Sequence, residues 1–147
     1  MENQEKSSSM EQQIAKKIIF QKVNEWLGIE LMEKEKILVG ETFMQPDFYS
    51  KSERVIGQIF THIGKTNRGQ DNRIANDILK MLLLEKLEGK TYRKIIVVCD
   101  ENKKKELLNG KTILAQCINQ FNIEVELINI ENELRDTLLI AQKRQRR

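Results

Sequence analysis

The sequence is poor in the residues that mark several classes of protein. Its 147 residues include one proline, seven glycines, two cysteines and a single histidine. The scarcity of proline and glycine excludes collagen-like and low-complexity chains. Cys99 and Cys117 have neither the CxxC spacing of a zinc site nor the density of a disulfide framework. We therefore expect both cysteines to be buried, reduced thiols.

The sequence also lacks long apolar runs. No stretch of about 18 apolar residues is present, which excludes a membrane-spanning helix. The polar opening MENQEKSSSMEQQ has no apolar segment of the kind that a secretory signal needs. Hydrophobic residues still make up 39% of the chain, which is enough for a core. These features predict a cytoplasmic protein with no membrane partner, built as a disordered tail over 1–10, one domain over 11–142 and a basic tail over 143–147.

Charge is divided unevenly along the chain. Residues 1–60 hold 8 basic and 10 acidic side chains, whereas residues 61–147 hold 17 and 12. The net charge of +3 is small for a nucleic-acid-binding protein, but Lys65, Arg68 and Arg73 gather in the stretch HIGKTNRGQDNRIAN. These cations either contact a phosphate backbone or cover a solvated loop, and we interpret the terminal KRQRR as a solvated tail.

Apolar periodicity predicts the order of helices and strands. Helical spacing covers the segments 11–27, 70–87, 101–121 (with Gly110 as a candidate break) and 131–142. Strand-like segments are 37–44, 54–63, 93–100 and 123–130, with a further candidate strand within 26–36. The first two strands are close enough for an antiparallel hairpin that turns near Lys51 and Ser52, and the last two need a crossover and a parallel pair. The sequence thus predicts an α/β fold with a mixed central sheet flanked by helices.

Nucleotide-binding loops are excluded by the spacing of glycine. The tripeptide GKT occurs three times, but a P-loop needs a further glycine five residues earlier so that backbone amides wrap the phosphates. Those positions hold Ile59, Leu84 and Lys105. The chain also contains no GxGxxG and no GxSxG motif.

A polar constellation surrounds the predicted hairpin. Gln58, Phe60 and His62 alternate onto one face of the second strand. Asp47 lies near the end of the first strand, and Lys65 follows the second. If the strands pair, a carboxylate, an amide, an imidazole and an ammonium group meet at one sheet edge. The alternative is that Gln58 and His62 face water on a half-exposed strand.

These residues resemble the signature of the PD-(D/E)XK, or restriction-endonuclease-like, nuclease superfamily. In that signature, PD is followed after a spacer by an acidic residue and, two positions later, by lysine. Here PD stands at 46–47, and PDFYS…RVIGQIFTHIGK…DILKMLL is similar to a group of small bacterial proteins of this fold. The order of elements over roughly 11–140 also resembles the core of the superfamily. The resemblance implies a restriction-endonuclease-like fold and hydrolysis of phosphodiester bonds in DNA with Mg²⁺ or Mn²⁺ as cofactor.

The resemblance can be carried over residue by residue. Asp47 matches the motif aspartate, which ligates the metal, whereas Gln58 stands where the second acid is expected and Phe60 where the lysine is expected. A neutral amide oxygen offers a divalent cation less than a carboxylate does, and phenylalanine cannot stabilise an anion. We therefore expect a metal site of Asp47 and Gln58 that is weak or absent, with Lys65 or His62 in the role of the motif lysine.

Other residues are candidates to complete this site. Glu25 and Glu41 are alternative sources of a carboxylate, and Lys80 is a second source of an ammonium group.

The start of the helix at 70–87 adds a candidate nucleic-acid contact, because free amides and the positive dipole end favour phosphate. Lys65, Arg68, Gln70 and Arg73 would hold the backbone there without reading sequence. The alternative is ordinary helix capping by Asp71.

The sequence thus supports more than one function. The first is a DNA endonuclease, impaired if Gln58 disables the metal site. The second is a non-catalytic module that retains the nuclease fold and binds nucleic acid or a protein. The third is an unrelated α/β domain in which Asp47, His62 and Lys65 never meet. Superfamily members often pair to cut two strands, which makes a homodimer a candidate assembly.

Overall fold

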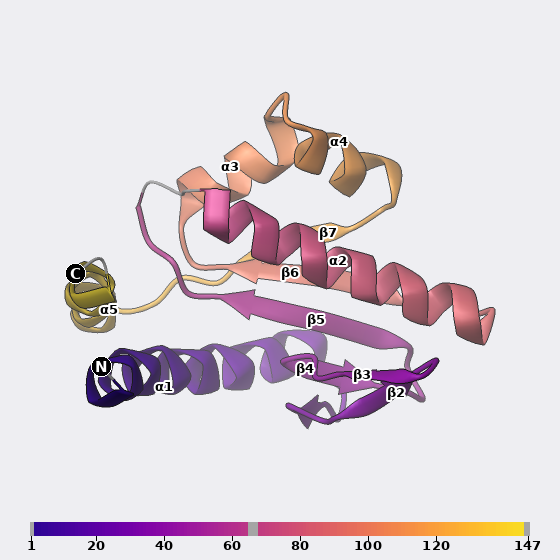
Figure 1. Cartoon of the computed structure of the whole chain (residues 1–147), viewed down its shortest axis with the longest axis horizontal. Coiled ribbons are helices and arrows are strands. Elements are labelled where there is room, and N and C mark those ends of the chain that lie inside the picture. Colours follow the sequence, from indigo (N-terminus) through magenta and orange to yellow (C-terminus); the bar gives the residue numbers. More distant parts are fainter. Residues whose placement is uncertain (1, 65–67, 146–147) are drawn as a thin grey trace.

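The computed structural model describes residues 2–64 and 68–145, with side chains from Met10 to Arg144. Within this part of the chain, the first helix is followed by five strands in succession, and helices and strands are interspersed after them (Figure 1). The helices are α1 (Glu2–Leu27), α2 (Arg68–Glu88), α3 (Glu101–Asn109), α4 (Ile113–Gln120) and α5 (Asn132–Gln145). The strands are β1 (Met32–Glu33), β2 (Ile37–Val39), β3 (Thr42–Met44), β4 (Phe48–Ser50), β5 (Val55–Phe60), β6 (Arg93–Val98) and β7 (Glu124–Leu127).

The central sheet has five strands in the order β1-β4-β5-β6-β7. β4 pairs antiparallel with both β1 and β5. β5, β6 and β7 run parallel to one another, so the predicted parallel pair of the last two strands is confirmed. β2 and β3 form a separate two-stranded hairpin. The sheet is therefore mixed, as the sequence predicts.

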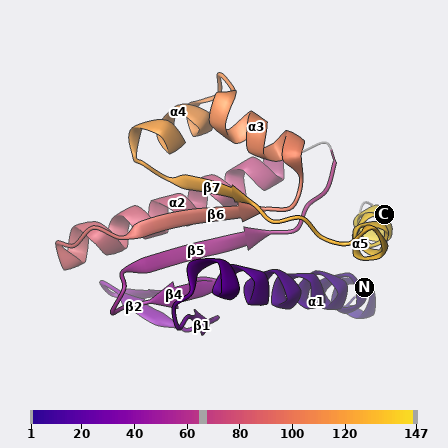
Figure 2. The ribbon, with the colours of Figure 1, turned by 180° about the vertical axis from the view of Figure 1, so that it is seen from behind.

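Helices cover both faces of this sheet (Figures 1 and 2). On one face, Ile74 and Ile78 of α2 pack with Ile96 of β6, and α3 and α4 complete the same cluster. On the other face, Ile19 of α1 packs with Val97 of β6 and with side chains of α5. Successive residues of β6 serve opposite cores because side chains alternate along a strand. No helix in the described ranges is both long and apolar enough to cross a bilayer.

The hairpin near the polar residues differs from the sequence prediction. The apolar run 37–44 is divided at Gly40, whose φ of +60° makes the tight turn between β2 and β3. Glycine adopts this left-handed conformation without steric cost. β5 consequently pairs with β4, and the turn at 51–54 joins them. Asp47 thus precedes β4 and does not end the run 37–44.

Several element boundaries also shift. α1 begins at Glu2, although the apolar spacing predicts a start near residue 11. The candidate strand within 26–36 is present as β1. Gly110 does separate two helices: α3 ends at Asn109, and the backbone N–H of Gly110 donates to the carbonyl of Glu106.

The two cysteines are both free thiols, but only one is buried. Cys99 is fully buried, its Sγ–H donates to the carbonyl of Phe60, and burial raises the pKa of the Cys99 thiol to about 12. Cys117 is only half-buried, because the short helix α4 lies at the surface. The expectation of a buried Cys117 is therefore wrong.

Candidate functional site

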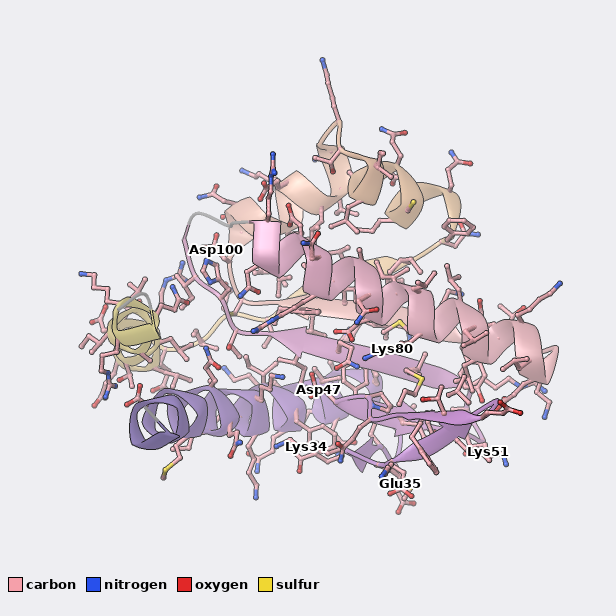
Figure 3. The ribbon with its side chains drawn as sticks, viewed as in Figure 1. Lys34, Glu35, Asp47, Lys51, Lys80 and Asp100 are labelled. Carbon is pink, nitrogen blue, oxygen red and sulfur yellow. The ribbon has the colours of Figure 1, made fainter. Side chains whose placement is uncertain are left out.

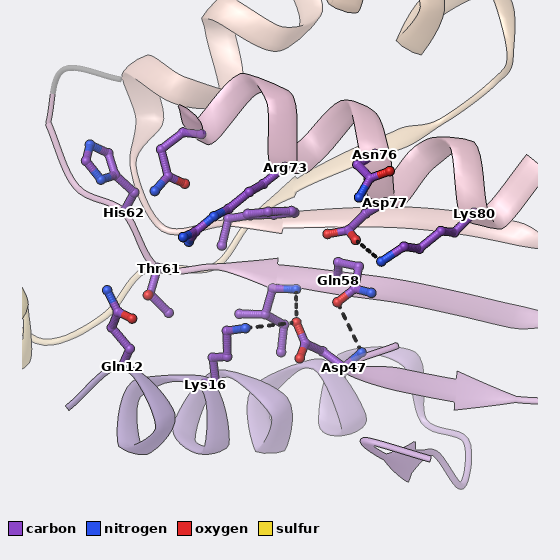
Figure 4. Close-up of a pocket in the computed structure, with 13 residues that line it drawn as sticks. Gln12, Lys16, Asp47, Gln58, Thr61, His62, Arg73, Asn76, Asp77 and Lys80 are labelled. Atoms are coloured by element: carbon purple, nitrogen blue, oxygen red, sulfur yellow. Dashed lines mark hydrogen bonds and ion pairs between the residues drawn. The ribbon is translucent and has the colours of Figure 1, made fainter. Parts of the chain in front are cut away.

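A cavity of about 290 Å³ opens at the edge of the sheet where β5 extends past β4 (Figure 4). Within β5, only residues 55–57 pair with β4. The next residues of β5, from Gln58 onward, line the cavity. Because α1 and α2 cover opposite faces of the sheet, both helices contribute side chains to this opening. The short strand β4 thus creates a site with walls from three elements.

Asp47 is held firmly at this edge. Its Oδ2 accepts a hydrogen bond from the backbone N–H of Ile59 at 2.7 Å, where a longer β4 would continue the ladder. The N–H of Asp47 donates to Oε1 of Gln58 at 3.3 Å, and Nζ of Lys16 lies 3.5 Å from Oδ2. Asp47 and Gln58 are each only 8% exposed. The carboxylate and the amide that the sequence places near one another do come together.

α2 brings a second carboxylate to the cavity, which the sequence analysis does not identify. Asp77 lines the cavity, and its Oδ1 lies 3.7 Å from Nζ of Lys80. Burial raises the pKa of Asp77 above its ordinary value; Lys80 opposes this effect, and the negative charge of Asp47 adds to it. Asp47 and Asp77 therefore interact electrostatically across the cavity.

Three cations line the same cavity as these carboxylates. Lys16 projects from α1, whereas Arg73 and Lys80 project from α2 (Figure 4). Each lysine pairs with one carboxylate, Lys16 with Asp47 and Lys80 with Asp77. The described lining thus contains both the acids that attract a metal ion and the cations that attract a phosphate.

The remaining sequence-predicted residues are placed unequally. His62, Gln70 and Arg73 line the cavity, with His62 at the end remote from Asp47 (Figure 4). Arg68 is exposed at the first position of α2 and is not part of the lining. Lys65 lies outside the described residues.

The two candidate substitutes for the missing acid do not line the cavity. Glu25 and Glu41 are exposed, and neither lines the cavity. Lys80, the second candidate ammonium group, does line it. Phe60, which stands at the lysine position of the motif, is half-buried and packs against the core on the α2 face.

A helical spacing in the sequence indicates the cavity residues of α2 that the nuclease motif does not include. Arg73, Asp77 and Lys80 follow one another at i, i+4 and i+7, which places them in one row of a helix. This row runs directly beside the apolar row of Ile74 and Ile78 that faces the core. Polar side chains next to the buried face of a helix lie at the rim of the surface that the helix packs on. Here that surface is the sheet, and the rim lies at β5.

The donor set suits a hard divalent cation. Asp47 and Asp77 supply carboxylates, and Gln58 supplies an amide oxygen. Mg²⁺ is usually held by one or two carboxylates together with water and substrate phosphate. Among the described residues, no group of three or more His, Cys, Asp and Glu side chains forms a metal cage.

Comparison of this chain with protein-family models, with curated proteins and with solved structures finds no match.

Proposed function

We propose that this chain is a metal-dependent phosphodiesterase of restriction-endonuclease-like fold that acts on DNA, with Asp77 in place of the acid that Gln58 lacks. The observation that supports this proposal is the meeting of Asp47 and Asp77 at one cavity, each beside a lysine. The mixed sheet flanked by helices is compatible with that fold.

Asp47 and Asp77 would hold the cation, and Gln58 would add a neutral oxygen. When bound, Mg²⁺ or Mn²⁺ polarises the phosphate and lowers the pKa of a water molecule. A carboxylate that ligates a cation binds its ammonium partner less strongly. Lys16 and Lys80 then become available to neutralise charge that develops on the phosphate oxygens.

The second candidate function is a non-catalytic module that binds nucleic acid. The specific observation in its favour is that both carboxylates already have ammonium partners, at 3.5 Å for Asp47 and 3.7 Å for Asp77. In such a cavity the carboxylate charges are already neutralised by lysines. A phosphate group could therefore bind to Lys16, Lys80 and Arg73 without a metal.

Calorimetric titration with Mn²⁺ tests the proposal. We expect wild type to bind Mn²⁺, and Asp47→Asn and Asp77→Asn each to abolish binding. Gln58→Glu adds a third carboxylate and should tighten binding by about tenfold, with a parallel gain in cleavage of a DNA substrate. Glu41→Gln, an exposed acid outside the cavity, is the matched control and should change neither.

Mn²⁺ affinity that is indifferent to both aspartate substitutions contradicts the metal site. DNA that binds in EDTA but is not cleaved when Mn²⁺ is present favours the non-catalytic module.

A further inference from the structure

The candidate active site is one end of a longer groove. A second hollow, of about 260 Å³, shares Lys16 and Asp47 with the first cavity. A third, of about 300 Å³, shares Gln13 and Lys34 with the second. The three hollows therefore follow one another past Asp47 and around the flank of α1. Figure 3 shows Asp47 between Lys80 and Lys34.

Cations outnumber acids in each of the three hollows. The first is lined by Lys16, Arg73 and Lys80, the second by Lys16 and Lys34, and the third by Lys17 and Lys34. Two carboxylates, those of Asp47 and Asp77, line the first hollow, whereas the second has only Asp47 and the third only Glu33. This distribution suits a linear polyanion, with one phosphate at the carboxylates and its neighbours at successive lysines.

The backbone of Lys34 lies in a left-handed turn. Lys34 has a φ of +55°, a left-handed conformation that costs a residue other than glycine on the order of 1 kcal/mol. The turn is held by two contacts: the N–H of Lys34 donates to the carbonyl of Asp47 at 3.3 Å, and Nε2 of Gln45 donates to the carbonyl of Lys34 at 2.8 Å. Glycine would fit this turn without that cost, and the side chain of Lys34 lines both the second and the third hollow.

We infer that this groove binds a single strand of DNA along its phosphodiester backbone, from Lys80 past Asp47 to Lys34. The inference rests on the proposed function for the phosphate that is cleaved. Asp47 and Gln58 are buried, so the reacting phosphate has to enter the cavity. A single strand bends at each nucleotide, whereas duplex DNA is stiff over about 150 base pairs and presents its phosphates on a regular outer surface. The groove therefore selects single strands over duplex.

The test is binding of a labelled DNA strand of about 12 nucleotides, measured by fluorescence anisotropy in EDTA over a series of salt concentrations. Lys34→Gly removes one positive charge from the groove and relieves the left-handed backbone, so we expect the fold to be preserved. Arg54→Gly is the matched control, because Arg54 is also basic, exposed and left-handed at φ +55°, yet lines none of the three hollows.

We expect Lys34→Gly to weaken binding about fivefold at low salt and to reduce the slope of log K against log salt by about 0.7. Arg54→Gly should leave both quantities unchanged, and a hairpin duplex should bind more weakly than the strand. Equal effects of the two substitutions, or duplex bound as tightly as the strand, overturn the inference. Because the measurement contains no metal, a groove effect without Mn²⁺ binding contradicts the nuclease alone. Mn²⁺ binding without a groove effect contradicts the groove alone.

Discussion

Asp77 carries a charge that the folded protein disfavours. Its side chain is only 19% exposed. Burial and the nearby negative charge of Asp47 destabilise its ionised form, and Lys80 offsets part of this effect. The pKa of Asp77 is therefore higher in the folded chain than in the unfolded chain. Between those two values the native state holds more protons, so the free energy of unfolding falls as pH rises through this window.

We predict that Asp77→Asn is more stable than wild type at pH 7 and loses that advantage near pH 3. The substitution removes the group whose ionisation opposes folding, and below the ordinary pKa of 3.8 wild type is relieved in the same way. Urea denaturation at the two pH values measures the difference. Asp136→Asn, an exposed acid on α5, controls for the loss of one negative charge. A variant that is less stable than wild type at pH 7 would contradict the electrostatic account.

At the scale of single elements, β4 and β5 fit together through a glycine. Phe48 stands opposite Gly57 in the antiparallel register, is fully buried, and lies over the glycine. A Cβ atom added at Gly57 would come within 2.0 Å of the Phe48 ring. Since Asp47 is the residue directly before Phe48, this contact also sets the position of the candidate site.

Gly57→Ala should destabilise the protein by about 1–3 kcal/mol, the usual cost of overpacking a core. Because the Phe48 ring has to move, we expect Mn²⁺ binding at Asp47 to weaken as well. Chemical denaturation and calorimetry provide the two measurements. The double variant Gly57→Ala with Phe48→Leu offers the added methyl group more space and should recover part of the stability. A single variant with wild-type stability would show that the ring is not fixed.

The sequence predicts some elements better than others for physical reasons. α2 and β6 carry long, regular apolar patterns, which local periodicity reports faithfully. The run 37–44 also looks like one strand, but a turn at Gly40 divides it, and pairing of β4 with β5 depends on contacts that no local pattern encodes. The meeting of Asp47 with Gln58 is anticipated, because hairpin partners are close in sequence. Asp77 is missed because α2 reaches the same cavity only through tertiary packing.

At the scale of the whole molecule, α5 secures the chain beyond β5. The side-chain amide of Gln142 accepts a hydrogen bond from the N–H of Ile63 at 2.8 Å and donates one to its carbonyl at 2.9 Å. Both groups are buried and are separated by 79 residues in sequence. The amide thus takes the place of a neighbouring strand and fixes the segment that carries His62.

Gln142→Ala should lower the free energy of unfolding by about 1–3 kcal/mol, because it leaves the buried N–H and carbonyl of Ile63 without their partner. Amide hydrogen exchange at Ile63 should accelerate, while exchange in the middle of β6 should follow only the global loss of stability. Lys143→Ala, at the next and exposed position of α5, is the control and should change stability by no more than about 0.5 kcal/mol. Unchanged exchange at Ile63 would show that the amide contact is dispensable.

The contact between Gln142 and Ile63 also has a consequence for synthesis on the ribosome. A chain emerges with its N-terminal part first, so β5 and β6 leave the exit tunnel well before residue 142. Until α5 follows, the backbone at Ile63 is accessible to water and to strands of other nascent chains. A chain that ends before residue 142 would therefore leave the backbone N–H and carbonyl of Ile63 without these partners, whereas a complete α5 supplies them.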